Sequence, residues 1–354
     1  MPKASTQPSV FESIKWVDDH LRIIDQTYLP NREIFLDIYE VGRIWEAIKS
    51  MRIRGAPAIG LAAAYGLYLG VKDLREDDLH EFETEVKRIS VYLASARPTA
   101  ANLQWALDKM IRTAHALRHK PITEIKNHLL NLAHSLLKED KRVCADIGKH
   151  GQILIPDKAD ILTHCNTGSL ATGQYGTALS VIYHAHMNNK NVHVWVDETR
   201  PLFQGSRLTS WELQRANIHH HIIADSAAGW VMQHKNVDMI IVGTDRVARN
   251  GDAANKIGTY SLAVLAKHHN IPFYIAAPLS SIDMNVKSGD SIPIEMRSEH
   301  ELRKVGQYMT APNQTPAYNP AFDITPYQLI TAFITEKGVV KPDYAENLAA
   351  ITAK

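Results

Sequence analysis

The sequence predicts an α/β protein: a Rossmann-like doubly wound parallel sheet domain preceded by a smaller, mainly helical N-terminal domain. Short apolar runs alternate with helical stretches from residue 159 onward. These runs are apolar on both faces, which is typical of parallel strands covered by helices. The chain has 354 residues, above the usual size of one domain of ~100–200 residues. We place the two domains at 1–121 and 122–354, because His119-Lys120-Pro121 interrupts the helical pattern.

In the N-terminal part, helical spacing of apolar residues dominates. The first dozen residues read as a disordered lead-in, and residues 14–24 form a small hairpin around Asp18-Asp19. The helices expected after it cover 39–50, the Ala/Leu/Tyr-rich stretch that ends at Gly70, 77–96, 101–117 and a long segment from Ile122.

The second part alternates strands and helices. Strands are expected at 160–164, 192–197, 220–225, 238–243 and 271–277. Helices are expected at 177–188, 208–216, 226–234 and 256–269. Parallel strands joined in this way should have right-handed crossovers.

Composition excludes several classes of function. The net charge of +1 gives no electrostatic footprint for nucleic acid or acidic membranes. No apolar run approaches the roughly 20 residues that span a bilayer, and the N-terminus lacks the apolar core of a signal peptide. The chain has two cysteines and no CxxC, which excludes a zinc site built on paired cysteines. We therefore expect a cytoplasmic protein with neither nucleic-acid nor membrane partners.

The stretch ADILTHCNTGSLATGQYG, residues 159–176, is the most informative one. An apolar strand is followed by Cys165, a loop of small residues with three glycines, and the start of a helix. This arrangement suits anion binding, because free backbone N–H groups and the helix dipole favour negative charge. A thiol at such a point can also have its pKa lowered. Cys144 lies mid-helix and is expected to be inert.

Polar residues follow nearly every predicted strand, where parallel sheets bind ligands. Asp245 emerges from a fully apolar strand, so partial desolvation would raise its pKa towards the range useful for acid–base chemistry. An ion pair with Arg246 or Arg249 would have the opposite effect. Asp225 has the pattern of a structural turn or capping residue.

Cationic side chains could clamp a phosphate. Arg54 and Arg97 lie in short loops, and Lys256, together with Asn255, is expected to open a helix. His219-His220-His221 suggests a metal site, but adjacent strand residues face opposite ways, so the three cannot share one ion. No metal is predicted.

These residues resemble the methylthioribose-1-phosphate isomerase family, which belongs with the regulatory subunits of eukaryotic initiation factor 2B. The resemblance covers nearly the whole chain. Its motifs are RGAPAIG at 54–60, ARPTAANL at 96–103, HCNTGSLATGQYGTAL at 164–179, DETRPLFQGSRLTSWEL at 197–213, GTDRVARNGDAANKIGTY at 243–260, AAPLSSID at 276–283 and NPAFDITP at 319–326.

The resemblance implies conversion of 5-methylthioribose 1-phosphate to 5-methylthioribulose 1-phosphate in methionine salvage, by a homodimer without metal or organic cofactor. It makes Cys165 and Asp245 the catalytic pair. It makes the substrate contacts Arg54, Gly55, Ala56, Arg97, Gln204, Asn255 and Lys256. Asp245 would act as general acid/base, and Cys165 as the base for the C2 proton or as a transition-state stabiliser.

Three alternatives remain open at this level. A related isomerase could act on ribose 1,5-bisphosphate or 5-deoxyribose 1-phosphate, depending on the pocket wall around the fifth carbon. A non-catalytic regulatory subunit is disfavoured by Cys165 and Asp245. An NAD-binding dehydrogenase is weak, because Gly168, Gly173 and Gly176 do not have the GxGxxG spacing.

Overall fold

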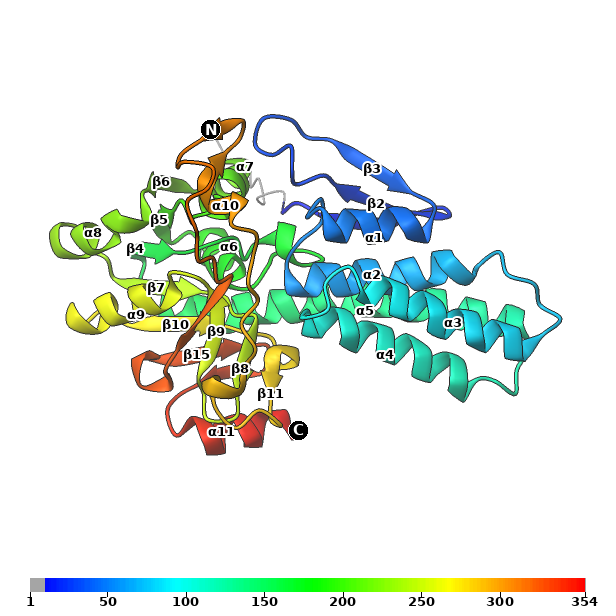
Figure 1. Ribbon diagram of the computed structural model, residues 1–354. Helices are drawn as coiled ribbons and strands as arrows, with labels where there is room; N and C mark the ends of the chain where they lie inside the picture. The colour runs from blue at the N-terminus through cyan, green and yellow to red at the C-terminus, as the bar shows by residue number, and fades with distance from the viewer. Residues whose placement is uncertain (1–9, 354) are drawn as a thin grey trace, which may run out of the picture. The chain divides into compact units, whose positions relative to one another are not determined.

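The protein is described here by a computed structural model that covers residues 10–353 (Figure 1). Its contacts divide the chain into two compact units. We call residues 144–168 and 177–353 the sheet unit, and residues 10–143 and 169–176 the helical unit.

A seven-stranded sheet forms the centre of the sheet unit, in the order β16-β15-β10-β7-β4-β5-β6. Its strands are β4 (Lys158–Thr163), β5 (Asn191–Asp197), β6 (His219–Ile223), β7 (Met239–Val242), β10 (Phe273–Ala276), β15 (Ala332–Thr335) and β16 (Gly338–Val340). Neighbouring strands are parallel except β16, which pairs antiparallel with β15. The chain starts in the middle, runs to one edge through β5 and β6, and then returns to β7. This is the doubly wound Rossmann order, and the predicted fold class is confirmed.

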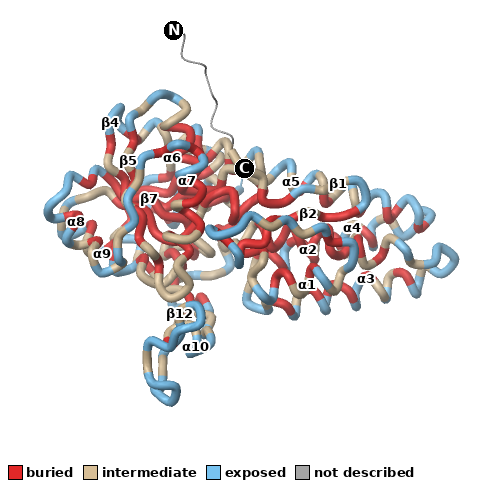
Figure 2. The backbone as a smooth tube through the Cα atoms, turned by 90° about the horizontal axis from the view of Figure 1, so that it is seen from above, coloured by how far each residue is buried: buried red, intermediate tan, exposed pale blue. Residues whose placement is uncertain are grey.

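The helices of the sheet unit connect these strands. They are α6 (Ala178–Met187), α7 (Ser210–Arg215), α8 (Ala228–His234), α9 (Thr259–His268), α10 (His300–Arg303) and α11 (Tyr344–Thr352). Helices α8, α9 and α11 share one apolar core with the strands, which includes Leu162, Ile240 and Phe333. Figure 2 shows β4, β5 and β7 as largely buried segments, as expected for strands covered on both faces.

A second, four-stranded sheet follows β7, in the order β11-β8-β9-β14. Its strands are β8 (Arg246–Ala248), β9 (Ala253–Lys256), β11 (Ile282–Asp283) and β14 (Phe322–Thr325), and the short strands β12 (Lys304–Val305) and β13 (Tyr308–Met309) form a separate ribbon. The predicted turn at Asn250-Gly251 joins β8 and β9. Gly251 has a φ of 92° there, a backbone conformation that favours glycine.

The helical unit combines a three-stranded antiparallel sheet with packed helices. Its elements are β1 (Ile14–Val17), β2 (His20–Ile24), β3 (Phe35–Ile38), α1 (Val41–Lys49), α2 (Ala56–Val71), α3 (Leu79–Ala94) and α4 (Ala101–Ala116). Helix α2 is almost entirely buried, because its alanines, leucines and glycines let α1, α3 and α4 pack around it (Figure 1). The predicted hairpin is confirmed as β1 and β2.

The long helix α5 (Ile122–Gly151) belongs to both units. Its residues Ile125, Leu129 and Ala133 are buried in the core of the helical unit. The division of contacts therefore falls inside α5, between Val143 and Cys144, and not before it at 121/122. None of the helices in the described range combines the length and apolar character needed to cross a membrane.

Candidate functional site

Cys165 and Asp245 follow two neighbouring parallel strands of the central sheet. Cys165 comes two residues after β4, and Asp245 three residues after β7. These strands pair in register through Ile161 with Met239 and Leu162 with Ile240. The order of the sheet reverses between them, and doubly wound folds bind their ligands at this reversal, outside the carboxyl ends of the strands.

The loops that carry these two residues are in direct contact. The Thr163 hydroxyl donates to the carbonyl of Ile241 at 2.8 Å, which joins the two strand ends. A Cβ added to Gly243 would lie 2.5 Å from Cγ2 of Thr167. Only glycine fits there, because the loop after β4 packs directly on the backbone after β7. The structure thus brings the Cys165 and Asp245 loops together at one edge of the sheet.

The backbone of Cys165 is fixed on both sides. Its N–H donates to the hydroxyl oxygen of Thr199 at 2.8 Å, and its carbonyl accepts from the Thr209 hydroxyl at 2.7 Å. Cys165 has a φ of 64°, in the left-handed region that costs a non-glycine residue of order 1–3 kcal/mol. The residue is 8% exposed. The surrounding hydrogen bonds therefore hold the backbone of Cys165 in a strained conformation.

Glu212 contacts two residues of the loop that carries Cys165. Its carboxylate accepts from the amide of Asn166 at 2.9 Å and from the Tyr183 hydroxyl at 3.0 Å. A Cβ at Gly168 would lie 2.4 Å from both carboxylate oxygens. The residues on either side of Thr167 therefore both pack against this buried acid, which fixes the course of the loop.

His164 and Asp197 form a buried pair beside Cys165. Nδ1 of His164 lies 2.8 Å from Oδ2 of Asp197, and Nε2 lies 2.8 Å from the carbonyl oxygen of Ile257. Burial raises the pKa of Asp197 to about 6 against the effect of His164. Burial lowers the pKa of His164, but the hydrogen bond and charge of Asp197 outweigh it, so that pKa is raised.

Asp225 lies close enough to this pair for the three side chains to be considered as metal ligands. Both ring nitrogens of His164 are already engaged, however. The Asp225 carboxylate accepts the backbone N–H groups of Thr199 and Arg200, each at 2.7 Å. The group therefore anchors loops and is not arranged for an ion. Asp225 is structural, as predicted, although it holds the loop after β5 and not its own helix.

Three further predicted residues lie on the same unit. Gln204 is buried and precedes Gly205, where a Cβ would meet the carbonyl oxygen of Asp197 at the end of β5. No described residue hydrogen-bonds the buried Oε1 of Gln204. Asn255 follows Ala254, whose carbonyl accepts the Asp245 N–H at 2.9 Å. The amide of Asn255 donates to Thr259 at 3.0 Å.

The expectation that Asn255 and Lys256 open a helix is wrong. They lie on β9, where Asn255 pairs with Asp323 and Lys256 with Phe322 of β14. Helix α9 begins at Thr259. The strand partners were far along the sequence, so local pattern alone did not identify the strand. The Lys256 ammonium donates to the carbonyl of Ala321 at 3.1 Å and lies 4.7 Å from the ring centroid of Phe322.

Arg54, Gly55 and Ala56 lie at the N-terminus of α2 in the helical unit. Gly55 is the N-cap, with a φ of 95°, and no side chain caps this helix end. Arg54 is buried, and its Nε donates to Oε1 of Gln26 at 3.3 Å. A long helix whose N-terminus has no side-chain cap, and which follows an arginine in the sequence, has features that favour an anion such as phosphate.

Arg97 lies in the connection between α3 and α4. The start of α4 packs closely on α2, because a Cβ at Gly60 would lie 2.8 Å from the carbonyl oxygen of Asn102. The structure therefore places Arg97 towards the same end of the helical unit as Arg54. The nine predicted residues thus form two sets, five in the sheet unit and four in the helical unit.

Known proteins are similar to this chain in sequence and in fold. The Initiation factor 2 subunit family model matches residues 52–342. The chain belongs to this family. It is 48% identical over 340 residues to a methylthioribose-1-phosphate isomerase of Heliobacterium modesticaldum, covering 96% of this chain and 99% of that protein. It is 49% identical over 336 residues to a 5-deoxyribose 1-phosphate isomerase of Bacillus thuringiensis, covering 95% and 96%.

The crystal structure of 5-methylthioribose 1-phosphate isomerase from Pyrococcus horikoshii is also similar. It has a TM-score of 0.92 and 42% identity, over 98% of this chain and 97% of that one. Like these relatives, this family member is an enzyme of the aldose–ketose isomerase class.

Sequence reasoning missed the residues of this family member that position the Cys165 loop. Thr199, Thr209 and Glu212 each hydrogen-bond residues 165 or 166. The sequence around Glu212 contains a signal for this role, because Glu212 stands between Trp211 and Leu213, both buried. A carboxylate in such a buried stretch requires hydrogen-bond partners, and this marks it as more than a surface residue.

Asp140 makes the stability of the helical unit depend on pH. The carboxylate of Asp140, a half-buried residue on α5, accepts the N–H of Gly173 at 2.6 Å, and its removal from water raises its pKa to about 7 from 3.8. Between these values the unfolded chain releases a proton that the folded chain keeps, so stability falls as pH rises, by at most about 1.4 kcal/mol per pH unit.

We therefore expect the stability of Asp140→Asn relative to the parent protein to increase as the pH rises from 4 to 8. Urea unfolding at several pH values measures this. Glu124→Gln, on an exposed part of the same helix, serves as the control and should show no such trend. A stability difference for Asp140→Asn that is constant with pH would contradict the assignment.

Proposed function

We propose that this enzyme converts 5-methylthioribose 1-phosphate to 5-methylthioribulose 1-phosphate, a step of methionine salvage, with Asp245 and Cys165 as its catalytic residues. The main support is that a carboxyl and a thiol follow the two strands at the reversal point of a Rossmann sheet. The names of relatives with almost half of their residues in common also support it. We expect the enzyme to act in the cytoplasm as a homodimer, without a cofactor in the reaction.

Asp245 acts as the general acid in this proposal. A sugar phosphorylated on its anomeric oxygen has no free aldehyde, so its ring opens only when the bond from C1 to the ring oxygen is broken. The protonated carboxyl of Asp245 gives its proton to the ring oxygen, which becomes the C4 hydroxyl. Asp245 is half-buried, so the residue is partly withdrawn from water.

Cys165 acts at C2. As a thiolate it removes the C2 proton, and the C–H electrons form a C1–C2 double bond. Protonation at C1 and loss of the C2 hydroxyl proton then give the ketone. In the competing path the C2 hydrogen moves with its electron pair to C1, the C2 hydroxyl loses its proton, and Cys165 only stabilises the transition state.

Deuterium at C2 of the substrate distinguishes these paths. Exchange of the label with solvent during turnover supports the thiolate as base. Complete retention at C1 supports the hydride path and assigns Cys165 to stabilisation.

The remaining predicted residues bind the substrate. Arg54, Gly55 and Ala56 supply a helix N-terminus and a guanidinium suited to a phosphate, and Arg97 adds a second guanidinium. Gln204, Asn255 and Lys256 supply donors and acceptors for the sugar. The buried, unsatisfied Oε1 of Gln204 is consistent with a hydrogen bond that forms only with the substrate bound.

Arg97→Ala should raise KM for the sugar phosphate at least about tenfold, because a charged hydrogen bond contributes roughly 1.5–3 kcal/mol, while kcat changes little. Steady-state kinetics measure both values. Arg112→Ala, an exposed arginine on α4, is the matched control. If KM is unchanged in the Arg97 variant, that residue does not bind the substrate.

A second candidate substrate is 5-deoxyribose 1-phosphate, because a relative with 49% identity carries that name. The two substrates differ only in the group on the fifth carbon. An isomerase assay with both compounds and with ribose 1,5-bisphosphate, at equal concentrations and with a chelator present and absent, tests the proposal. A kcat/KM highest for the methylthio compound supports it. Turnover of none of them would favour a binding subunit.

A further inference from the structure

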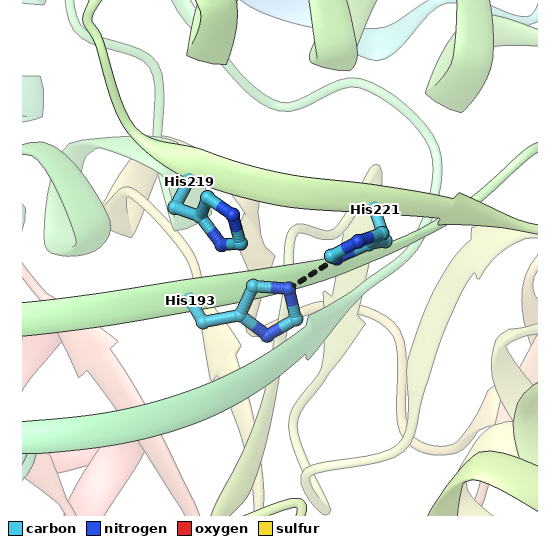
Figure 3. A group of neighbouring side chains, drawn as sticks. All are labelled: His193, His219 and His221. Carbon is cyan, nitrogen blue, oxygen red and sulfur yellow. Dashed lines mark hydrogen bonds between the residues drawn. The ribbon is translucent and has the colours of Figure 1, made fainter.

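Three histidines from two neighbouring strands meet on one face of the sheet (Figure 3). His193 is on β5, and His219 and His221 are on the edge strand β6. His193 pairs in register with His219, and residues two apart on a strand share a face. One nitrogen of each ring lies within 4.8 Å of one nitrogen of each of the others. The argument that His219-His220-His221 cannot share an ion holds for the triplet, but the neighbouring strand supplies the third ring.

A carboxylate fixes the orientation of the His193 ring. Oδ1 of Asp160, on β4, accepts from Nδ1 of His193 at 2.6 Å and from the Trp195 indole at 3.2 Å. Nε2 of His193 is then the nitrogen without a proton, and it faces the other two rings. A carboxylate behind a histidine is the usual support of a metal ligand.

Nε2 of His193 lies 2.7 Å from Nδ1 of His221 (Figure 3). Two imidazole nitrogens bound to one zinc ion at ~2.0–2.1 Å in tetrahedral geometry are roughly 3.3 Å apart. The two nitrogens therefore need to separate by about 0.6 Å, the rings need to turn so that both lone pairs point to the ion, and His221 needs to move its proton from Nδ1 to Nε2.

We propose that His193, His219 and His221 bind one divalent transition-metal ion, with zinc as the physiological candidate and water in the remaining position. Imidazole is a preferred ligand for zinc, nickel and copper, but not for magnesium or calcium. The site lies near the amino ends of β5 and β6, whereas the candidate catalytic residues follow carboxyl ends of the same sheet. The ion would tie the edge strand to its neighbour and take no part in isomerisation.

His220 provides a matched control on the same strand. It lies between the two proposed ligands, faces the opposite way, and its Nδ1 lies 2.9 Å from the carbonyl oxygen of Ile218. His220→Ala removes a histidine without touching the cluster. Asp160→Asn keeps the shape of the supporting residue but removes its charge, and such changes weaken metal binding about 10–100-fold.

The test is zinc binding by the full chain, measured by isothermal titration at neutral pH after treatment with a chelator. We expect one ion per chain for the parent protein and for His220→Ala. We expect at least about 10-fold weaker binding for His221→Ala and for Asp160→Asn. Zinc should also raise the Tm of the first two proteins more than that of the others. Isomerase rates without zinc, equal in all four, show that the variants are folded.

Several outcomes would overturn the proposal. The first is that the parent protein binds zinc no more tightly than His221→Ala does. Another is an equal loss of affinity in His220→Ala. Because a thiolate is also a good zinc ligand, Cys165→Ser is included: loss of binding in that variant, with binding intact in His221→Ala, would place the ion on the thiol.

Discussion

Asp245→Asn should lose turnover by about 10²–10⁴-fold, the usual contribution of a general acid or base. The asparagine side chain has nearly the same shape, so the N–H of residue 245 still reaches Ala254 and the loop after β7 keeps its course. Only the transferable proton is removed. KM should therefore change by no more than a few-fold, and the loss should lie in kcat.

The matched control is Asp238→Asn. Asp238 lies just before the amino end of the same strand, β7, where its carboxylate accepts the N–H of Asp160 at 2.7 Å. It shares the strand with Asp245 but lies at the opposite edge of the sheet, so kcat should stay within about twofold of the parent value. Comparable losses in both variants would indicate a general effect on folding. An active Asp245→Asn enzyme would remove the carboxyl from the proposed mechanism.

The central strands could be predicted because their apolar runs are local and continuous. Each of the five predicted strands, such as 192–197 for β5, overlaps an observed one. General rules limit the possible orders of these strands within the sheet, but the sequence alone does not determine the order. The order reverses between β4 and β7, and this brings the loops that carry Cys165 and Asp245 to the same edge of the sheet.

Pairings between distant residues could not be predicted. Asn255 and Lys256 are expected to open a helix, but they pair with β14, which lies far along the chain. The sequence argues against a metal site at His219-His220-His221 for the same reason, because His193 supplies the third ring from another strand. Glu212 and Thr209 act on the Cys165 loop through hydrogen bonds that span more than forty residues. A sequence pattern shows periodicity and local chemistry. Contacts between residues that are distant in the sequence depend on neither of these.

Gly55→Ala should lower the Tm and weaken substrate binding together. Gly55 has a φ of 95°, and an added Cβ would lie 2.5 to 2.6 Å from the Cα, Cβ and carbonyl oxygen of Ala171. The strained backbone alone costs of order 1–3 kcal/mol. Since the obstructing atoms belong mainly to the backbone, relief requires a shift of the 169–176 segment or of the N-terminus of α2, where we place the phosphate.

Two controls separate the contributions. Gly338→Ala has a φ of 129° with no atom within 4 Å of the added Cβ, so it measures backbone strain without a clash. Gly42→Ala lies on α1 of the helical unit with its nearest atom 3.9 Å away, and a helical alanine there should be neutral or stabilising by up to about 1 kcal/mol. Thermal unfolding should rank Gly55→Ala lowest, with KM raised only in that variant. A Tm equal to that of Gly338→Ala would mean that the contact with Ala171 contributes nothing to stability. An unchanged KM would mean that the start of α2 does not hold the phosphate.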